Sequence, residues 1–388
     1  MRIAMVSPGP PPAGGGIGAY TEKTSRTLAA MGHEVHVLIP GTSQLATEIV
    51  DGVRLHRVPT GRIRPQALAR SLAVNRALRR LGRLDIVQAC EWEGEAWWYS
   101  LHPGASLVTR LATPHFVVED QEQMPRLRRW RTFVRRWLER SQTRRSARVI
   151  SPSTTLAGEV ARRWRLRPES ITIVPTGIRR PRAADGSLPE DLRQLEYVLY
   201  FGRLERRKGV DTWIDALPEV LASRPSLHAV FVGDDGGMQG RLFIEIARER
   251  CGEYWPRLHF LPEMPQARLF PIVAAARMVV MPSRSESLAN ACLEAMALGR
   301  PVVATRGTGL SELITDGVDG FLVPPGDVAA LAATVRTAVS DDALLARVRQ
   351  AARRRAGDFD LDRMVDKLVR VYEDVVDRRA LSPSVTST

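Results

Sequence analysis

The sequence has 388 residues, which fits two domains of about 150–200 residues, each able to bury its own core. Hydrophobic (44%) and charged (26%) residues occur in ordinary proportions, but the net charge of +13 predicts an anionic partner: nucleotide phosphates, an acidic membrane surface or nucleic acid. Three scattered cysteines exclude a disulfide framework, and neither a secretory leader nor an apolar run of about 18 residues is found, so we expect a cytoplasmic protein.

In the first half of the chain, short apolar runs alternate with amphipathic stretches, the pattern of parallel strands joined by helices. We predict strands at 2–7, 34–39, 53–58, 85–90, 106–112, 148–151 and 171–175. The segment "TGIRRPRAADGSLPED" (176–191) is rich in Pro, Gly and charge, which is typical of an interdomain linker. The strand pattern then restarts, at 196–202, 228–233, 258–261, 277–282, 301–305 and 320–323.

This order of elements predicts an α/β protein with two Rossmann-like, doubly wound βαβ domains, 1–178 and 192–358, which face each other across a cleft. Ligands of such sheets bind at the carboxyl ends of the strands. The amphipathic stretch at about 360–380 predicts a C-terminal helix that packs back on the first domain. "DLD" (360–362) resembles a metal-binding motif, but it lies where this helix starts, so we interpret it as a cap.

"GGGIGAY" (14–20) formally matches the dinucleotide-binding pattern through Gly14, Gly16 and Ala19. The context argues against NAD, because prolines separate these glycines from the preceding strand and no carboxylate ends the next strand. Two interpretations remain: a plain tight turn, or a glycine loop that opens a helix at 17–27, whose free amides suit an anionic group. We favour the phosphate-facing loop.

"YFGRLERRKGVD" (200–211) places Arg203 just beyond a strand end and Lys208 before a helix. A guanidinium and an ammonium at this point could hold a diphosphate between them; the alternative is a solvated basic loop. Lys208 is one of only three lysines in a chain whose other basic residues are arginines, which gives a lysine at this position extra weight.

"MPSRSESLANACLEAMALGRPVVAT" (281–305) predicts a strand end, a polar loop with Glu286 and a helix that begins near Leu288. The first amides of that helix, at 287–290, suit an anion. Glu286 can accept hydrogen bonds from hydroxyls beside the anion, and Glu294, about two turns along the helix, can reach a second polyol. Two glutamates at this spacing are more often surface residues, but in this context they predict a nucleotide sugar as ligand.

"RLRRWRTFVRRWLERSQTRRSAR" (126–148) has ten Arg and one Glu, with Trp130, Phe133, Val134 and Trp137 at helical spacing. Such a helix can lie on an anionic membrane, or it can pack its aromatic face into the first domain. We expect no nucleic-acid partner, because no recognised binding module accompanies the charge.

"CEWEGEAWW" (90–98) follows a predicted strand end. Either Trp92 or Trp97 could stack on an acceptor sugar, and burial in the domain is the alternative for at least one of them.

Taken together, several motifs fall in a familiar order and spacing: "FGRLERRKG", "VGDDGG", "LHFLPEM", "MPSRSESLANACLEAMALGRPVVAT", "GLSELI" and "DGFLVPPGD". The chain resembles the retaining glycosyltransferases of family 4, which have the GT-B fold, and "RIAMVSPGPPPAGGGIGAY" and "RVISPST" extend the resemblance over nearly the whole chain. It implies transfer of a sugar from a UDP- or GDP-sugar to a hydroxyl of a glycan, lipid or small molecule. It also implies front-face attack with retention, and neither a cofactor nor a metal.

The resemblance implies a donor site in the second domain. Arg203 and Lys208 would bind the diphosphate and stabilise the leaving phosphate, while Glu286 would contact the donor sugar and Glu294 the ribose. The donor would also meet the backbone of Ser287, Leu288 and Ala289, which stand where the family often has a small residue, Phe and Gly.

In the first domain, the resemblance implies that His115 is the active-site histidine near the hydroxymethyl group of the sugar. His115, Arg203, Lys208 and Glu286 would be the catalytic residues. Gly16 would approach the phosphate and, with Gly15 and Trp92, the acceptor.

Two further departures from the family are Phe116, where an Asp often follows the histidine, and Pro262, where a glycine is usual. The expected partners are a nucleotide-sugar donor, a glycan or lipid-linked acceptor and an anionic inner membrane surface that binds 126–148. Two alternatives remain open: a sugar-nucleotide epimerase or phosphorylase on the same fold, and a non-catalytic scaffold that binds a sugar nucleotide or membrane.

Overall fold

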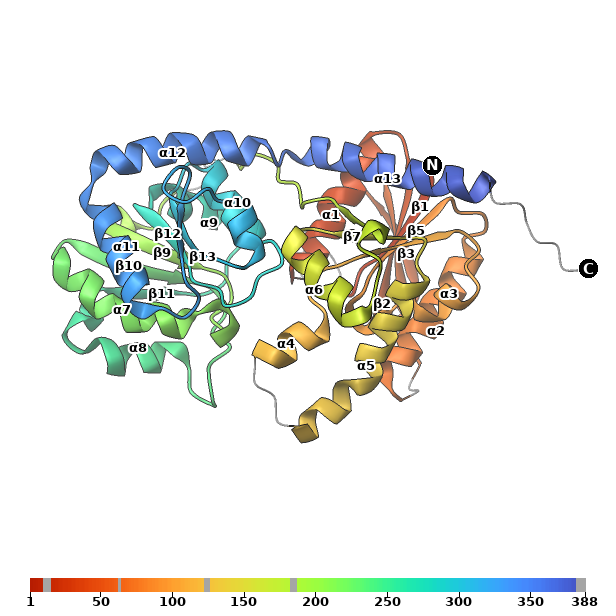
Figure 1. Cartoon of the computed structure of the whole chain (residues 1–388), viewed down its shortest axis with the longest axis horizontal. Helices are drawn as coiled ribbons and strands as arrows, with labels where there is room; N and C mark the ends of the chain where they lie inside the picture. Colours follow the sequence, from red (N-terminus) through yellow and green to blue (C-terminus); the bar gives the residue numbers. More distant parts are fainter. Residues whose placement is uncertain (10–14, 62–63, 122–125, 182–186, 382–388) are drawn as a thin grey trace, which may run out of the picture. The chain divides into compact units, whose positions relative to one another are not determined.

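The computed structural model describes residues 1–9, 15–61, 64–121, 126–181 and 187–381. Its contacts divide the chain into two compact units, one formed by 1–177 with 361–388 and the other by 178–360 (Figure 1). Each unit is built on one sheet with helices on both faces. Within the described residues, no helix is both long enough and apolar enough to cross a bilayer.

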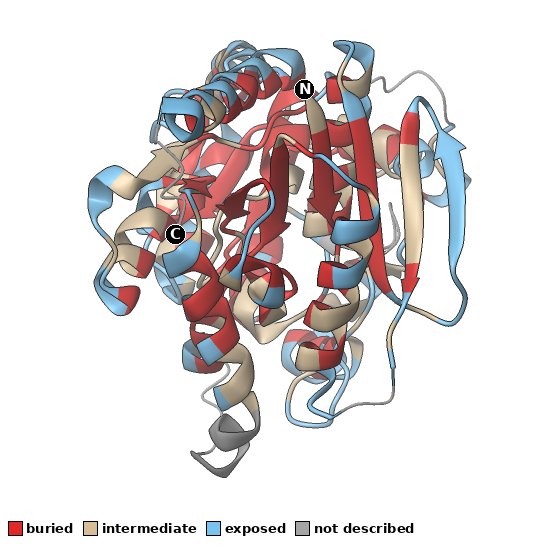
Figure 2. Ribbon diagram, turned by 90° about the vertical axis from the view of Figure 1, so that its right-hand side faces the viewer, coloured by how far each residue is buried: buried red, intermediate tan, exposed pale blue. Residues whose placement is uncertain are grey.

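The sheet of the first unit has eight strands in the order β3-β4-β2-β1-β5-β6-β7-β8. They are β1 (Arg2–Val6), β2 (Glu34–Thr42), β3 (Ala46–Val50), β4 (Val53–Pro59), β5 (Ile86–Cys90), β6 (Ser106–Arg110), β7 (Arg148–Ser151) and β8 (Ile171–Ile173). All pairs are parallel except β3 with β4. The central strands are almost wholly buried (Figure 2), as both faces of a parallel sheet require.

Alternate residues of β1 enter two different cores, one on each face of this sheet. Ile3 and Met5 pack with α1 (Gly15–Ala30) and α13 (Leu361–Leu381), whereas Ala4 and Val6 pack with α2 (Gln66–Arg80) and α3 (Trp97–Leu101). The hydroxyl of Tyr372 in α13 donates to Gln88 Oε1 at 2.7 Å. The other helices of the unit are η1 (Trp92–Gly94), α4 (His115–Gln121), α5 (Arg126–Arg145), α6 (Thr154–Trp164) and η2 (Pro168–Ser170).

The sheet of the second unit is parallel throughout, in the order β11-β10-β9-β12-β13-β14. Its strands are β9 (Glu196–Phe201), β10 (Leu227–Val232), β11 (Leu258–Leu261), β12 (Met278–Met281), β13 (Val302–Thr305) and β14 (Phe321–Val323). Its α-helices are α7 (Val210–Ser223), α8 (Phe243–Cys251), α9 (Gln266–Ala275), α10 (Asn290–Ala297), α11 (Val328–Ser340) and α12 (Asp342–Gly357). Its 3₁₀ turns include η4 (Glu190–Leu192), η5 (Arg206–Lys208), η6 (Gly252–Arg257) and η7 (Gly309–Glu312).

Every predicted strand is found, usually one or two residues shorter, and the α/β class is confirmed. One strand, β3, was not predicted; it is an exposed edge strand that makes the first sheet mixed rather than parallel. The start of the Glu294 helix was predicted too early: α10 begins at Asn290, so Glu294 lies about one turn along it, not two. The boundary at residue 288 was wrong because Ala289, the residue before α10, has no side-chain capping group that marks the start.

Candidate active site

The second sheet changes the direction of its strand order at β9, since β10 lies on one side of it and β12 on the other. Such a switch point places two loops side by side at the carboxyl ends of neighbouring strands, where doubly wound proteins bind ligands. The loops here are 202–209, with Arg203 and Lys208, and 282–289, with Glu286. Three of the predicted site residues are therefore brought to one edge of one sheet.

The two loops are held in direct contact. Gly209 has φ of 71°, and a β-carbon there would lie 1.9 Å from the carbonyl oxygen of Pro282, so only glycine allows this approach. The guanidinium of Arg284 binds both carboxylate oxygens of Asp211, at 2.5 and 3.0 Å, and donates to the carbonyl of Arg206 at 2.7 Å. This bidentate ion pair ties the loop after β12 to the start of α7.

At the centre of these loops, Lys208 Nζ donates a hydrogen bond to Glu286 Oε2. The side chains are largely buried, with 22% of Lys208 and 10% of Glu286 exposed. Burial raises the pKa of Glu286, but Lys208, followed by Arg207 and Arg203, outweighs it and holds the pKa below its usual value. Glu286 is thus a carboxylate, and its own carbonyl accepts the N–H of Gly309 at 2.7 Å.

Arg203 differs from Lys208 in its surroundings. Its side chain is 63% exposed and lies 2.8 Å from a carboxylate oxygen of Glu205, which also pairs with Arg207 at 3.4 Å. An exposed guanidinium on a long side chain can change partner at little cost. Arg203 is therefore available to an incoming anion. Lys208 already donates to Glu286, so an anion that binds Lys208 would compete with that carboxylate.

Glu294 is 6% exposed and lies on α10, where it accepts a hydrogen bond from Gln266 Nε2 at 3.0 Å. Of the residues before the helix, Leu288 packs in the apolar core, so any ligand contact there is limited to its backbone. Ser287 is half-buried and Ala289 precedes the first helical residue, which leaves their amides at the helix start.

In the first unit the strand order changes direction at β1, between β2 and β5. The loop after β1 leads to α1, which starts at Gly15, and Gly14 of the glycine pattern lies outside the described residues. Gly16 is exposed, and a β-carbon there would meet no atom within 4 Å. Packing of the described chain therefore does not require a glycine at this position.

Two predicted residues meet after β5 and β6. Trp92, in η1, stacks on His115, the first residue of α4, with ring centroids 4.0 Å apart and planes 19° from parallel. On α5, Glu139 accepts the backbone N–H of His115 at 3.1 Å and lies 2.5 Å from His115 Nδ1. Sequence reasoning missed Glu139, although it is the one acidic residue in the basic stretch 126–148.

The same loop carries two other carboxyl groups that sequence reasoning did not single out. Both oxygens of Glu91 lie within hydrogen-bond distance of the Ala112 N–H, at 2.9 and 3.0 Å, and burial raises the pKa of Glu91 to about 7. Burial likewise raises the pKa of Glu95 to about 8, although Arg70 opposes the shift. Through their contacts with Ala112 and Arg70, Glu91 and Glu95 hold the loop that contains Trp92.

Phe116, one of the departures from the family pattern, has a packing role. It is 6% exposed and meets Trp164 of α6 edge to face, with ring centroids 5.7 Å apart. An ionised Asp at this position would lose that contact and leave a charge in the core.

Trp97 is held in the first unit by a hydrogen bond, in which its Nε1 donates to Ser141 Oγ at 3.0 Å.

Comparisons with known proteins identify the family and the fold. The family model "Glycosyl transferases group 1" matches residues 196–341, and "Glycosyltransferase Family 4" matches 14–180. Among relatives, the glycogen synthase of Mycobacterium tuberculosis H37Rv is 30% identical over 417 residues, covering 96% of this chain and 94% of its own. The D-inositol 3-phosphate glycosyltransferase of Geodermatophilus obscurus is 28% identical over 399 residues, covering 94% and 86%.

Solved structures share the fold at lower identity. Sucrose-phosphate synthase from Thermosynechococcus elongatus has a TM-score of 0.80 at 22% identity and covers 97% of this chain and 100% of its own. HepE from Anabaena, in complex with UDP and glucose, has a TM-score of 0.73 at 20% identity and covers 96% and 100%. The chain therefore belongs to glycosyltransferase family 4 and is a glycosyltransferase with the two-domain GT-B fold.

Proposed function

We propose that this glycosyltransferase takes a sugar from a nucleoside diphosphate sugar, a UDP- or GDP-sugar, and transfers it to an acceptor hydroxyl with retention of configuration. The observation that carries the proposal is the contact between Lys208 and Glu286 at the strand-order switch of the second sheet. In the proposal, the cation would bind a phosphate and the carboxylate beside it would bind sugar hydroxyls. The related structures of HepE are complexes with UDP, UDP and glucose, or UDP-glucose, which supports this class of donor.

The charges of this loop pair suit a departing diphosphate. In the proposal, Arg203 turns from Glu205 to the diphosphate, and Lys208 donates to a phosphate oxygen while it stays close to Glu286. The two cations would stabilise the negative charge that grows on the leaving group as the bond to the sugar breaks. They would supply this charge without a metal, so we expect activity in EDTA.

In the proposal, Glu286 and Glu294 bind hydroxyl groups of two different sugars. Glu286, held ionised by Lys208, would accept hydrogen bonds from the donor sugar, and Glu294 from the ribose. We place the amides of 287–290 against the diphosphate. We assign no covalent intermediate to Glu286. The acceptor oxygen would attack the anomeric carbon on the face that the diphosphate leaves, the bond from that carbon to the diphosphate oxygen would break, and the hydroxyl proton would pass to the departing phosphate.

The acceptor side of the proposal rests on the first unit. The half-buried indole of Trp92 and the imidazole of His115, which is 5% exposed, stack on each other at the carboxyl ends of β5 and β6. Such an aromatic surface suits a sugar ring, and His115 adds a polar edge for a hydroxyl. Gly15 and Gly16, at the start of α1, would let the acceptor or a phosphate approach the backbone closely.

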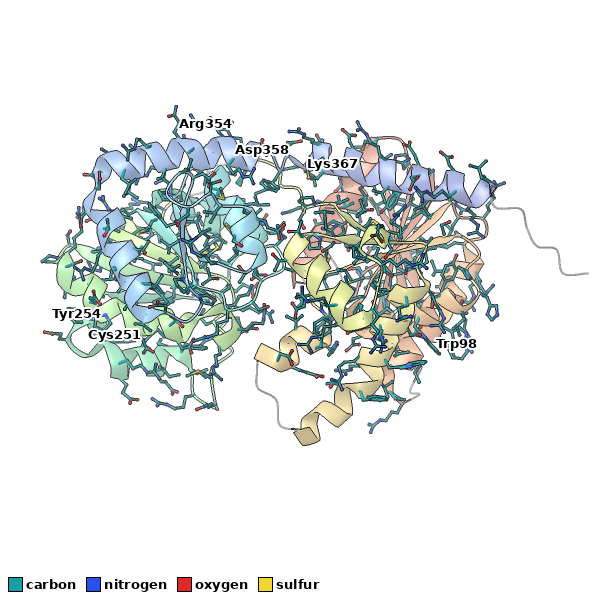
Figure 3. The ribbon with its side chains drawn as sticks, viewed as in Figure 1. Trp98, Cys251, Tyr254, Arg354, Asp358 and Lys367 are labelled. Carbon is teal, nitrogen blue, oxygen red and sulfur yellow. The ribbon has the colours of Figure 1, made fainter. Side chains whose placement is uncertain are left out.

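We also propose that α5 meets an anionic membrane surface, where a lipid-linked acceptor would be found. Phe133 and Trp137 are 54% and 48% exposed, and Trp98 (labelled in Figure 3) is 41% exposed. Trp97 joins them, with ring centroids 5.2 Å from Trp137 and 5.5 Å from Trp98. Exposed aromatic side chains on an arginine-rich helix are typical of interfacial membrane binding.

The test is a transfer reaction in EDTA with UDP-glucose, and in parallel with GDP-mannose, against a panel of glycan, lipid-linked and polyol acceptors. The proposal predicts a product with the anomeric configuration of the donor, read by NMR from the H1–H2 coupling for glucose and from the one-bond C1–H1 coupling for mannose. An inverted product would contradict retention. Donor turnover to an epimer without any acceptor would instead identify an epimerase, and binding without turnover would identify a scaffold.

A further inference from the structure

Glu139 makes an unusual set of contacts for a residue of a basic helix. Its side chain is fully buried, and its two oxygens accept backbone N–H groups from two different segments: Oε1 from Glu93 and Oε2 from His115, each at 3.1 Å. Oε1 also lies 2.5 Å from His115 Nδ1. A carboxylate can only accept hydrogen bonds, so with Glu139 as a carboxylate the donor in this third contact is the imidazole N–H.

The other sides of the imidazole are also defined. Trp92 covers one face of the ring, and Glu139 fixes the next residue of the Trp92 loop, Glu93, whose φ is 58°. Close packing of the same loop on α5 requires Gly94, where a β-carbon would lie 2.6 Å from the β-carbon of Leu138. The remaining nitrogen of His115, Nε2, has no hydrogen-bond partner among the described residues.

We propose that Glu139 is a positioning residue of the transfer site. It keeps a proton on Nδ1 of His115, so that Nε2 is the nitrogen left for a substrate hydroxyl, and it fixes the ring and the Trp92 loop together. This inference rests on the proposed function only for its kinetic part, since the position of the proton can be measured without turnover. The arrangement follows a general rule: the bond at one ring nitrogen decides what the other can do.

The variant Glu139→Gln keeps the size of the side chain but cannot keep its contacts. In one amide orientation the NH₂ group faces the N–H of Glu93 and the imidazole N–H, and in the other it faces the N–H of His115. Glu119→Gln is the matched control. Glu119 is also buried, lies on α4 with His115 and pairs with Arg136 of α5 at 3.0 Å, but makes no hydrogen bond to His115.

The experiment uses the full chain labelled with ¹⁵N-histidine, and His115→Asn assigns the signals. In the wild type and in Glu119→Gln we expect a proton on Nδ1; in Glu139→Gln we expect the proton to move at least partly to Nε2. A wild-type ring with bare Nδ1 would overturn the inference, and so would ring signals that Glu139→Gln leaves unchanged. The wild-type measurement decides even if the variants do not fold.

Kinetics supply the second measurement, with UDP-glucose and GDP-mannose as donors, the same acceptor panel, and release of the nucleotide as signal. We expect Glu139→Gln to lower kcat about 100-fold with little change in the donor KM, because a misplaced contact affects the reacting geometry most. Glu119→Gln should keep the wild-type kcat, and Glu139→Asp should recover part of it. If the wild type is active and Glu139→Gln has the same kcat, the positioning role is refuted but the proposed function is not. If the wild type is inactive with both donors, the proposed function is refuted.

Discussion

Lys208 and Glu286 are separated by 78 positions in the sequence, yet the ammonium of one donates directly to the carboxylate of the other. The contact exists because β9 and β12 are neighbours in the sheet, so the loops that follow them start side by side. Lys208 keeps the pKa of the largely buried Glu286 below its usual value. In the proposed function, a phosphate bound to Lys208 would lie beside the carboxylate of Glu286.

The first prediction concerns Lys208→Ala. Removing this cation should lower kcat about 100-fold or more, because a fixed charge beside the departing group is typically worth that much. Lys367→Ala is the matched control, since Lys367 (Figure 3) is an exposed lysine of α13, and it should leave kcat unchanged. Steady-state kinetics and circular dichroism check both variants; a folded Lys208→Ala enzyme with normal turnover would rule out the cation's role.

Glu294→Ala should weaken donor binding without a comparable loss of kcat at saturating donor. Hydrogen bonds to a charged group contribute about 1.5–3 kcal/mol, which corresponds to a Kd raised roughly 10- to 100-fold. Gln266→Ala removes the neighbour of Glu294 and separates a local packing effect from loss of the carboxylate. Calorimetric titration of each variant with the nucleotide diphosphate is the measurement, and an unchanged Kd for Glu294→Ala would remove the ribose role.

The sequence predicted the strands well because most are buried runs of apolar residues, but β3 has a different character. All five of its residues are exposed, so "ATEIV" lacks an apolar face to reveal it. A signal did exist in the next two residues: Asp51 and Gly52 have φ of 50° and 79°, and Asp-Gly is a typical hairpin turn. The edge strand could have been found from its turn rather than from its hydrophobicity.

The residues of the candidate site also differ in how readily the sequence reveals them. Arg203, Lys208 and Glu286 were identified because each lies next to a strand end, and strand ends can be read from the sequence. Glu139 was missed because its partner, His115, lies 24 positions away, and only the packing of α5 brings them together. The pair Arg284–Asp211, 73 positions apart, was missed for the same reason.

Stability should depend on pH through Glu91. Burial raises its pKa from the usual 4.5 to about 7. Because the folded-state pKa lies above the unfolded one, the contribution of Glu91 to stability is complete below pH 4.5 and is lost as the pH rises through 7. At most about 3 kcal/mol is involved.

The variant Glu91→Gln stays neutral and can still accept the N–H of Ala112. Urea unfolding should show that it gains stability relative to the wild type between pH 5 and pH 8. The difference between the two proteins is the quantity to compare, because other groups titrate in both. Equal pH dependence of the two proteins would show that Glu91 is ionised in the folded state.

Membrane binding should depend on the exposed aromatic side chains of α5. Phe133→Ser with Trp137→Ser should weaken binding to vesicles that contain phosphatidylglycerol at least about tenfold, since each buried side chain contributes about 1.5–3 kcal/mol. Leu242→Ser with Val318→Ser, which changes residues of the second unit with similar exposure (45% and 55%), should have no effect. If the wild type does not sediment with these vesicles, the membrane proposal fails.

Arg135 and Arg136 are unsuitable for this test, although they belong to the basic stretch. They form ion pairs with Glu93 and Glu119, so reversing their charge would disturb the packing around Trp92 and α4. Arg140 is exposed on the same helix and is the better residue for charge reversal. Its replacement by Glu should weaken binding to the anionic vesicles and leave the unfolding midpoint unchanged.

The most direct test of the account is donor-dependent stabilisation of the purified chain in EDTA, measured with UDP-, GDP-, ADP- and TDP-sugars. At a concentration one hundred times its Kd, a ligand of the folded state adds about 2.7 kcal/mol to the free energy of unfolding. We predict stabilisation of this size by a UDP- or GDP-sugar, and its loss in Lys208→Ala but not in Lys367→Ala. A folded chain that responds to none of the donors, or a Lys208→Ala variant stabilised as fully as the wild type, would contradict the donor site proposed at Lys208 and Glu286.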